Sequence, residues 1–188
     1  MKKVFLVCFS LCFIVLQVSA QKPMFNQNDN LVGFSLGFGG AHPMYGKYYK
    51  STPYISGFYE RCIIGELFDQ KSSLGVGGLV GFMSTRWDDK SSKWGYNHFL
   101  IGARGAFHYT FLTNLDTYAC AILGWRTSSW KDTSSPSGVK LPGHKDYSGF
   151  VNDVYVGGRY YFHESISAYL ELGYGWGATA NIGISFKF

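Results

Sequence analysis

The feature that most constrains this chain is the alternation of apolar with polar or small residues along residues 169–188. Apolar side chains occupy every second position in two runs there: Leu170, Leu172 and Tyr174, then Ile182, Ile184, Phe186 and Phe188. Polar residues such as Glu171 and Lys187 lie between them. A period of two is typical of a β-strand with one apolar and one polar face. We therefore expect a sheet whose two faces meet different surroundings.

The first twenty residues have the pattern of an export signal. Lys2 and Lys3 give a basic start, residues 4–16 form an apolar run, and Val18-Ser19-Ala20 has the small residues of a cleavage site. The run is shorter than an ordinary membrane-spanning helix. A lipoprotein signal ending at Cys12 is disfavoured because the bulky Leu11 precedes it. We expect a cleaved signal over 1–20, a loose periplasmic leader over 21–29 and one domain over 30–188.

Composition narrows the classes of function. Removing twenty residues from 188 leaves 168, enough for one domain, and losing Lys2 and Lys3 takes the net charge from +5 to +3. That charge is too mild to predict a nucleic-acid partner. Cys62 and Cys120 remain, and we interpret them as small half-buried side chains, since their spacing alone does not establish a disulfide.

Eight strands are predicted, and no apolar run after residue 20 is long enough for a spanning helix, so any membrane crossing must use strands. Aromatic residues at 19% and 24 glycines favour a barrel with crowded walls and tight turns. The strands are expected at about 31–39, 53–63, 74–86, 95–109, 116–127 and 149–162, with two more within 169–188. Short turns alternate with longer polar loops at 41–52, 87–94 and 128–147, which is the pattern of a transmembrane barrel with both chain ends in the periplasm.

Alternation also predicts which side chains face the lumen and which face lipid. Charged residues are expected in the lumen: Glu60, Arg104, Asp153, Arg159, Glu171 and Lys187. Arg61, on the outer face, is expected to snorkel at the membrane edge. Aromatic residues near the strand ends are expected to form two girdles at the membrane interfaces: Tyr109, Tyr160, Phe162 and Phe188 at one, and Phe38, Phe82, Trp125 and Tyr174 at the other.

Several segments give the chain a resemblance to a known family. These are Tyr59-Glu60, Gly157-Gly158-Arg159-Tyr160-Tyr161, Glu171-Leu172-Gly173-Tyr174-Gly175 and the strand that ends at Phe188. Together they resemble the small eight-stranded outer-membrane proteins of the OmpX and OmpA transmembrane-domain type. The resemblance implies an all-β, eight-stranded antiparallel up-and-down transmembrane β-barrel in the bacterial outer membrane. It also implies contact with outer-membrane lipids and lipopolysaccharide, and a terminal Phe188 that the barrel-assembly machinery reads.

The leading functional hypothesis is a non-enzymatic barrel that acts structurally or through surface contacts. An eight-stranded lumen is just wide enough for side chains, so we favour a plug of ion pairs over a gated path for small solutes. Surface contacts would come from loop residues: Tyr45, Tyr48, Tyr49, Trp87, Trp94, Trp130 and Lys131. We favour the alternative that these aromatic residues pack on one another or lie at the membrane interface.

A lipid A or phospholipid-modifying enzyme is the second hypothesis, and a soluble ligand-binding barrel is the third. His163-Glu164-Ser165 superficially resembles the His-x-Ser of outer-membrane deacylases, but it falls in a predicted periplasmic turn. His98 and His108 are ten residues apart in one strand, and neither has an obvious serine partner by spacing. The five histidines show no close metal-ligand spacing, so neither metal nor cofactor is predicted.

Overall fold

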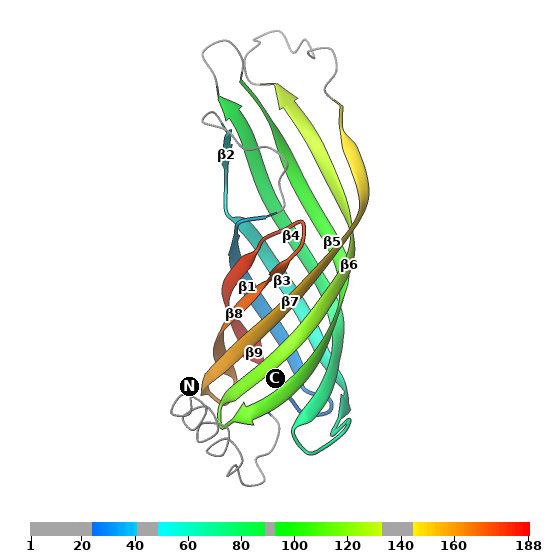
Figure 1. Ribbon diagram of the computed structural model, residues 1–188, viewed down its shortest axis with the longest axis vertical. Helices are drawn as coiled ribbons and strands as arrows, with labels where there is room; N and C mark the ends of the chain where they lie inside the picture. The colour runs from blue at the N-terminus through cyan, green and yellow to red at the C-terminus, as the bar shows by residue number, and fades with distance from the viewer. Residues whose placement is uncertain (1–23, 41–48, 89–92, 133–144) are drawn as a thin grey trace, which may run out of the picture.

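The computed structural model describes residues 24–40, 49–88, 93–132 and 145–188, and these residues form an all-β fold (Figure 1). The strands are β1 (Asn30–Phe38), β2 (Tyr49–Ser51), β3 (Tyr54–Gly65), β4 (Ser72–Asp88), β5 (Lys93–Leu112), β6 (Leu115–Asp132), β7 (Tyr147–His163), β8 (Ile166–Tyr174) and β9 (Ala180–Lys187). Within these ranges, no helix has the length and apolar character needed to cross a membrane.

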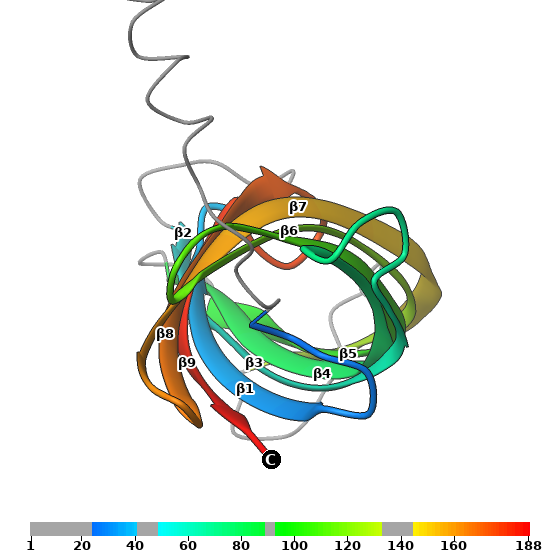
Figure 2. The ribbon, with the colours of Figure 1, turned by 90° about the horizontal axis from the view of Figure 1, so that it is seen from below.

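Eight of the strands close into a ring. Consecutive strands from β3 to β9 pair antiparallel, β1 pairs with β3, and the first and last strands join through a register from Leu31↔Lys187 to Phe38↔Ala180. The three residues of β2 add only to the edge of β4, where Tyr49 lies opposite Trp87. Figure 2 shows the ring from below. The predicted eight-stranded antiparallel up-and-down barrel is confirmed.

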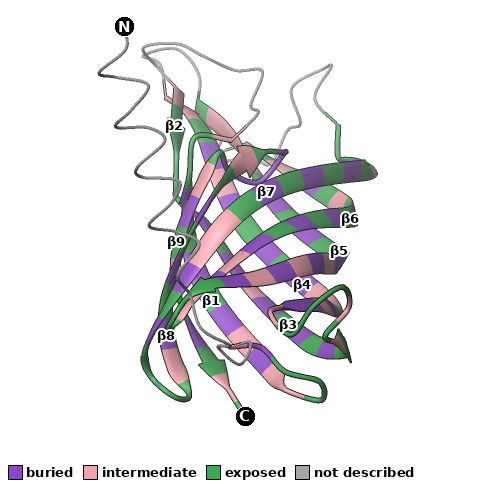
Figure 3. Cartoon of the chain, turned by 60° about the horizontal axis from the view of Figure 1, so that its bottom comes forward, coloured by how far each residue is buried: buried purple, intermediate pink, exposed green. Residues whose placement is uncertain are grey.

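Buried and exposed residues alternate along the strands (Figure 3). In β1, for example, Ser35 is buried whereas Phe34 and Leu36 are exposed on the outer wall. Because successive side chains of a strand point to opposite faces, one parity fills the lumen and the other forms the outer surface. About thirty large apolar side chains have 38% to 81% of their area exposed, and most of them lie on that outer surface. An apolar outer wall around a polar lumen is the arrangement of a barrel that spans a lipid bilayer.

The two ends of the barrel differ in their connections. At one end, here called the turn end, residues 66–71, 113–114 and 164–165 join the strands. Asn114 has a φ of 65° in its two-residue turn, a left-handed conformation that asparagine tolerates better than most residues. At the other end, here called the loop end, the connections include residues 39–48, 89–92, 133–146 and 175–179. Both chain termini of the barrel proper, Asn30 and Phe188, lie at the turn end, where their backbones exchange hydrogen bonds.

Two of the predicted loops are shorter in the structure because the strands continue into them, and a separate short strand, β2, lies within the third. Trp87 and Trp94 are opposite each other in β4 and β5, with ring centroids 6.0 Å apart and nearly parallel planes. Trp130 and Lys131 belong to β6, which ends at Asp132 and not near residue 127. The polar composition misled the prediction, because an antiparallel ladder tolerates polar side chains on both faces and cross-strand aromatic pairs stabilise it. Tyr49 lies in β2, whereas Tyr45 and Tyr48 are outside the described residues.

Residues 24–29 do not form a loose leader. Phe25 is fully buried, with its ring centroid 4.7 Å from that of His108. The Met24 amide donates to Thr110 Oγ1 at 3.1 Å, and Lys187 Nζ donates to the Met24 carbonyl at 2.9 Å. The segment therefore folds back into the turn end and closes it. An isolated apolar residue in a polar stretch gave no periodic signal for this. The predicted signal at 1–20 lies outside the described residues.

Candidate functional site: the charged lumen

Arg104 on β5 joins carboxylates that come from other parts of the barrel. Its Nε donates to Glu60 Oε2 on β3 at 3.0 Å, and its Nη2 donates to Glu171 Oε1 on β8 at 2.8 Å. The side chains of all three residues are almost fully buried. Strands β6 and β7 separate β5 from β8, so the second pair crosses the lumen and does not follow the wall. Charged side chains therefore bridge the lumen at this level.

A second set of charged groups lies next to Glu60, on the side toward the turn end. His108 Nε2 bonds Glu60 Oε1, and His108 Nδ1 lies 2.9 Å from Asp116 Oδ2. Arg159 Nη1 donates to the same Asp116 oxygen at 2.9 Å. Both ring nitrogens of His108 thus face carboxylates, and the ring can donate to both only when each nitrogen carries a proton. In that state three bases balance three acids.

We call this group the lumen cluster, and it draws on five strands. Its members are Glu60, Arg104, His108, Asp116, Arg159 and Glu171. Aromatic rings cover its cations: the Arg104 guanidinium lies 4.6 Å from the Phe58 centroid, and that of Arg159 lies 4.8 Å from the Tyr118 centroid. The Tyr118 hydroxyl also donates to Glu171 at 3.0 Å. Buried charges need such partners, because an unpaired charge in a low-dielectric interior is strongly destabilising.

Glycines in the wall make room for the cluster. Gly75 lies on β4, next to the strand of Glu60, and faces the lumen. A Cβ at this position would overlap Glu60 Oε1. Gly157 lies beneath the Tyr118 ring, and a Cβ there would be 2.7 Å from Tyr118 Cζ. A narrow barrel can hold large side chains at one position only if the position facing them is small. These glycines are therefore part of how the lumen is filled.

The structure brings together four of the six residues that the sequence analysis assigned to the lumen: Glu60, Arg104, Arg159 and Glu171. Asp153 lies apart, and its Oδ1 accepts from the Trp176 amide at 2.6 Å. Lys187 lies at the turn end, with Nζ 3.6 Å from Asp29 Oδ2. His108 and Asp116 were missed as cluster members. The alternation of the strand could have identified His108, because it is four residues from Arg104 and therefore on the same face.

Contrary to the expectation from spacing, His98 has a serine partner. His98 Nδ1 lies 2.8 Å from Ser128 Oγ, because the two residues are directly opposite in the β5–β6 register. His98 Nε2 lies 3.1 Å from Thr85 Oγ1, so a hydroxyl holds the position that an orienting carboxylate takes in a hydrolytic triad. All three side chains are buried. The arrangement is that of a hydrogen-bonded row within the lumen.

The His163 segment lies in the exposed turn between β7 and β8, as expected. Its contact with Ser165 runs from the Ser165 amide to His163 Nδ1 at 3.3 Å and does not involve the serine hydroxyl. Across residues 24–40, 49–88, 93–132 and 145–188, no three His, Cys, Asp or Glu side chains are grouped so that they could hold a metal ion.

Aromatic contacts line the inner face of the loop end. Trp94 packs edge-on against Tyr96, with centroids 6.0 Å apart, and Tyr96 packs against Tyr147 at 5.4 Å. The Arg126 guanidinium lies between Tyr147 and Trp176, at 4.8 and 4.9 Å from their centroids. The aromatic residues that the sequence analysis assigned to surface loops are thus partly strand residues packed on one another.

The eight aromatic residues assigned to the girdles are on the outer wall. Tyr160, Phe162 and Phe188 are exposed near the turn end, where Tyr109 is half-buried and donates to Asp69 Oδ2 at 2.9 Å. The other four are exposed nearer the loop end: Phe38, Phe82, Trp125 and Tyr174. Arg61 is exposed on the outer face at the turn end, and its Nη2 reaches Asn28 Oδ1 at 3.4 Å.

A closed ring of eight strands, an apolar outer wall and a charged lumen define the class of small outer-membrane β-barrels. No protein-family model matches the sequence, and no curated protein matches it either. Among solved structures, the chain is similar to the N-terminal β-barrel domain of Pseudomonas aeruginosa OprF, with 14% identity and a TM-score of 0.51 over 86% of this chain and 98% of that one. It is also similar to Ail, the attachment invasion locus protein of Yersinia pestis, with 9% identity and a TM-score of 0.48 over 86% and 99%. The OprF likeness identifies the fold as that of an outer-membrane barrel.

Proposed function

We propose that this protein is a non-enzymatic barrel of the bacterial outer membrane, with a closed lumen and a structural or surface-interaction role at its loop end. The observation that carries the proposal is the lumen cluster. Arg104 spans the barrel between Glu60 and Glu171, and this binding of charged groups to one another across the lumen supports a closed interior. A barrel of eight strands has an interior that side chains can fill.

A planar-bilayer recording with the purified protein tests whether the lumen is closed. The closed lumen predicts little or no steady conductance at neutral pH, with an open porin in the same bilayer as the positive control. Steady openings on the nanosiemens scale would contradict the proposal and favour the small-solute path.

Comparison of membrane lipids tests the enzyme alternative. The proposal expects identical mass spectra of lipid A and phospholipids from cells with and without the protein. Support comes from His98, which is buried and bonded to hydroxyls on both sides, whereas a hydrolytic base needs an accessible nucleophile and an orienting acid. A new lipid species that depends on Ser128 would overturn the non-enzymatic assignment.

The lengths of the strands support a role at the cell surface. A transmembrane strand needs about 9–11 residues, and β1, β8 and β9 have nine, nine and eight. In contrast, β4, β5 and β6 have 17, 20 and 18 residues and rise above the β8–β9 connection (Figure 1). About half of β5 therefore extends beyond one bilayer thickness. We place this tall wall outside the cell and the turn end in the periplasm, since outer loops exceed periplasmic turns in this class.

Labelling of intact cells tests that orientation. Lys131→Cys, at the exposed top of β6, is expected to react with a membrane-impermeant maleimide. Glu164→Cys, in an exposed turn-end connection, is expected to react only after the outer membrane is permeabilised. The reverse pattern would contradict the placement of the tall wall.

The proposed partners follow from the outer wall. Outer-membrane lipids, including lipopolysaccharide at the loop end, would contact the exposed apolar rows. The barrel-assembly machinery would read β9, whose outward residues Ile182, Ile184 and Phe186 are exposed and alternate with inward Asn181 and Ser185.

A further inference from the structure

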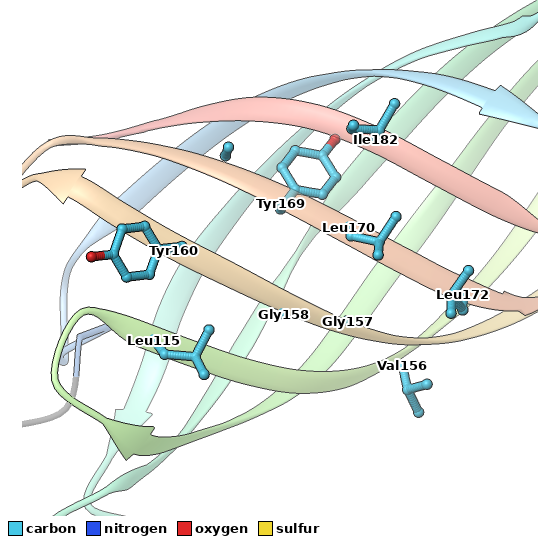
Figure 4. Close-up of a pocket in the computed structure, with 10 residues that line it drawn as sticks. Leu115, Val156, Gly157, Gly158, Tyr160, Tyr169, Leu170, Leu172 and Ile182 are labelled. Carbon is cyan, nitrogen blue, oxygen red and sulfur yellow. The ribbon is translucent and has the colours of Figure 1, made fainter.

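The outer wall has an apolar hollow of about 600 Å³ over β7 and β8 (Figure 4). Gly157 and Gly158 form its floor on β7. Leu170 and Leu172 project from β8 on one side, and Leu115 projects from β6 on the other (Figure 4). The hollow therefore lies in the surface that faces hydrocarbon if the barrel spans the membrane as proposed.

The hollow exists because small residues interrupt a wall of large ones. Gly158 faces outward between Val156 and Tyr160, whose side chains are 61% and 55% exposed. Ala168 lies directly opposite Tyr160 on β8 and is also small. A neighbouring hollow of about 400 Å³ also contacts Val156 and Gly157 and continues across β6 to β5. Gly158 has no side chain to occupy the outward position between Val156 and Tyr160.

The chemistry of the surroundings decides what fills the hollow. Its lining is apolar, and an unfilled space would cost its lining atoms their van der Waals partners. A flexible hydrocarbon chain can follow such a depression. A second copy of this chain, joined by a two-fold axis, fills the hollow only if an outward side chain of the same patch enters it, because both copies contribute the same patch to such an interface.

One end of the hollow carries a polar group. Tyr160 lines it and lies near the turn end, three residues before His163, and Tyr109 lines the adjoining hollow at the same end. Phenol rings with an apolar body and a hydroxyl are favoured at the headgroup level of a bilayer. We propose that the hollow over Gly157 and Gly158 binds one acyl chain of a phospholipid from the leaflet next to the turn end. This inference rests on the proposed membrane location and adds a defined lipid site to it.

Native mass spectrometry of the full-length protein, extracted from membranes in mild detergent, tests the proposal. Gly158→Leu fills the hollow, and a Cβ there meets only Leu115 Cδ1 at 3.9 Å. Gly105→Leu is the matched control, since Gly105 is outward on β5 and a Cβ there meets nothing within 4 Å. Wild type and Gly105→Leu are expected to retain one phospholipid per barrel. Gly158→Leu is expected to bind about tenfold less, the effect of losing contact with roughly two methylene groups.

Each other outcome overturns the site. Equal lipid retention by all three proteins would show that the bound lipid is unspecific. Bound lipopolysaccharide in place of phospholipid would contradict the proposed leaflet. A dimer without lipid would show that the hollow is a contact between two copies of the chain. Slower gel migration after heating verifies that each variant is a folded barrel, and Ala168→Leu on β8 replaces Gly158→Leu if that variant does not fold. Recovery of wild type outside the membrane fraction would refute the proposed location. Recovery in membranes without the selective adduct would refute the lipid site alone.

Discussion

Replacing Arg104 by methionine is the change that most directly tests how the lumen is held together. Methionine keeps an unbranched apolar stem but removes two buried ion pairs, to Glu60 and to Glu171. Glu60 would keep His108 as a partner, whereas Glu171 would keep only the Tyr118 hydroxyl and the Asn181 amide, at 3.0 and 3.3 Å. The variant therefore leaves a buried carboxylate without a balancing cation.

The size of the effect follows from this uncompensated charge. Removing one partner of a buried ion pair typically costs about 3–5 kcal/mol. The guanidinium also lies 4.6 Å from the Phe58 centroid, which adds to the loss. We expect Arg104→Met to lower the free energy of unfolding by about 4 kcal/mol. With a urea m-value of about 2 kcal/mol/M, the midpoint would fall by roughly 2 M.

The assay is urea unfolding of the refolded barrel in lipid vesicles, followed by tryptophan fluorescence. Lys93→Met provides the control, because Lys93 and Asp88 form an exposed pair at 3.2 Å and such pairs contribute less than about 1 kcal/mol. The double variant Arg104→Met/Glu171→Gln removes the stranded charge and should be more stable than Arg104→Met by about 1–3 kcal/mol. Losses that simply add in the double variant, or a single-variant loss as small as that of Lys93→Met, would refute the reasoning.

Three further predictions use the same preparation. Phe25→Ala should lower the free energy of unfolding by about 3–5 kcal/mol because it empties a fully buried site. Phe68 is 81% exposed, so the control Phe68→Ala should change this free energy by less than about 0.5 kcal/mol. Equal effects of the two substitutions would mean that residues 24–29 do not seal the turn end. Gly157→Ala should lower the free energy of unfolding by about 1–3 kcal/mol through its clash with Tyr118, whereas Gly158→Ala should leave it unchanged or raise it. If our inward and outward assignments are reversed, the urea midpoints of the two variants will rank in the opposite order. The buried free thiols of Cys62 and Cys120 should react with a maleimide only in urea, and mass spectrometry that finds labelled folded protein would contradict their burial.

The face to which each strand residue points was predictable because apolar and polar residues alternate with a period of two. Once one residue of a strand is assigned, every other residue follows, so Glu60, Arg104, Arg159 and Glu171 could be placed inward without coordinates. The number of strands was predictable for a related reason, since each apolar row must end before the chain can turn.

Register and strand ends were not predictable in the same way. Which residue of β5 meets which residue of β6 depends on the turn at residues 113–114, and that register is what puts Ser128 beside His98 and Asp116 beside His108. Toward the loop end, both faces of the wall are polar or aromatic, so the periodic signal fades although the ladder continues to Asp132. The burial of Phe25 is a tertiary effect with no local pattern.

Consecutive glycines show how one local choice can act on both sides of a barrel. Because neighbouring residues of a strand face opposite ways, Gly157 opens the lumen side and Gly158 opens the lipid side of the same segment of β7. The inward space is taken by the Tyr118 ring, which covers Arg159 and bonds Glu171. The outward space is the apolar hollow. A side chain added at Gly157 would therefore meet the Tyr118 ring in the lumen, whereas one added at Gly158 would enter the outer hollow.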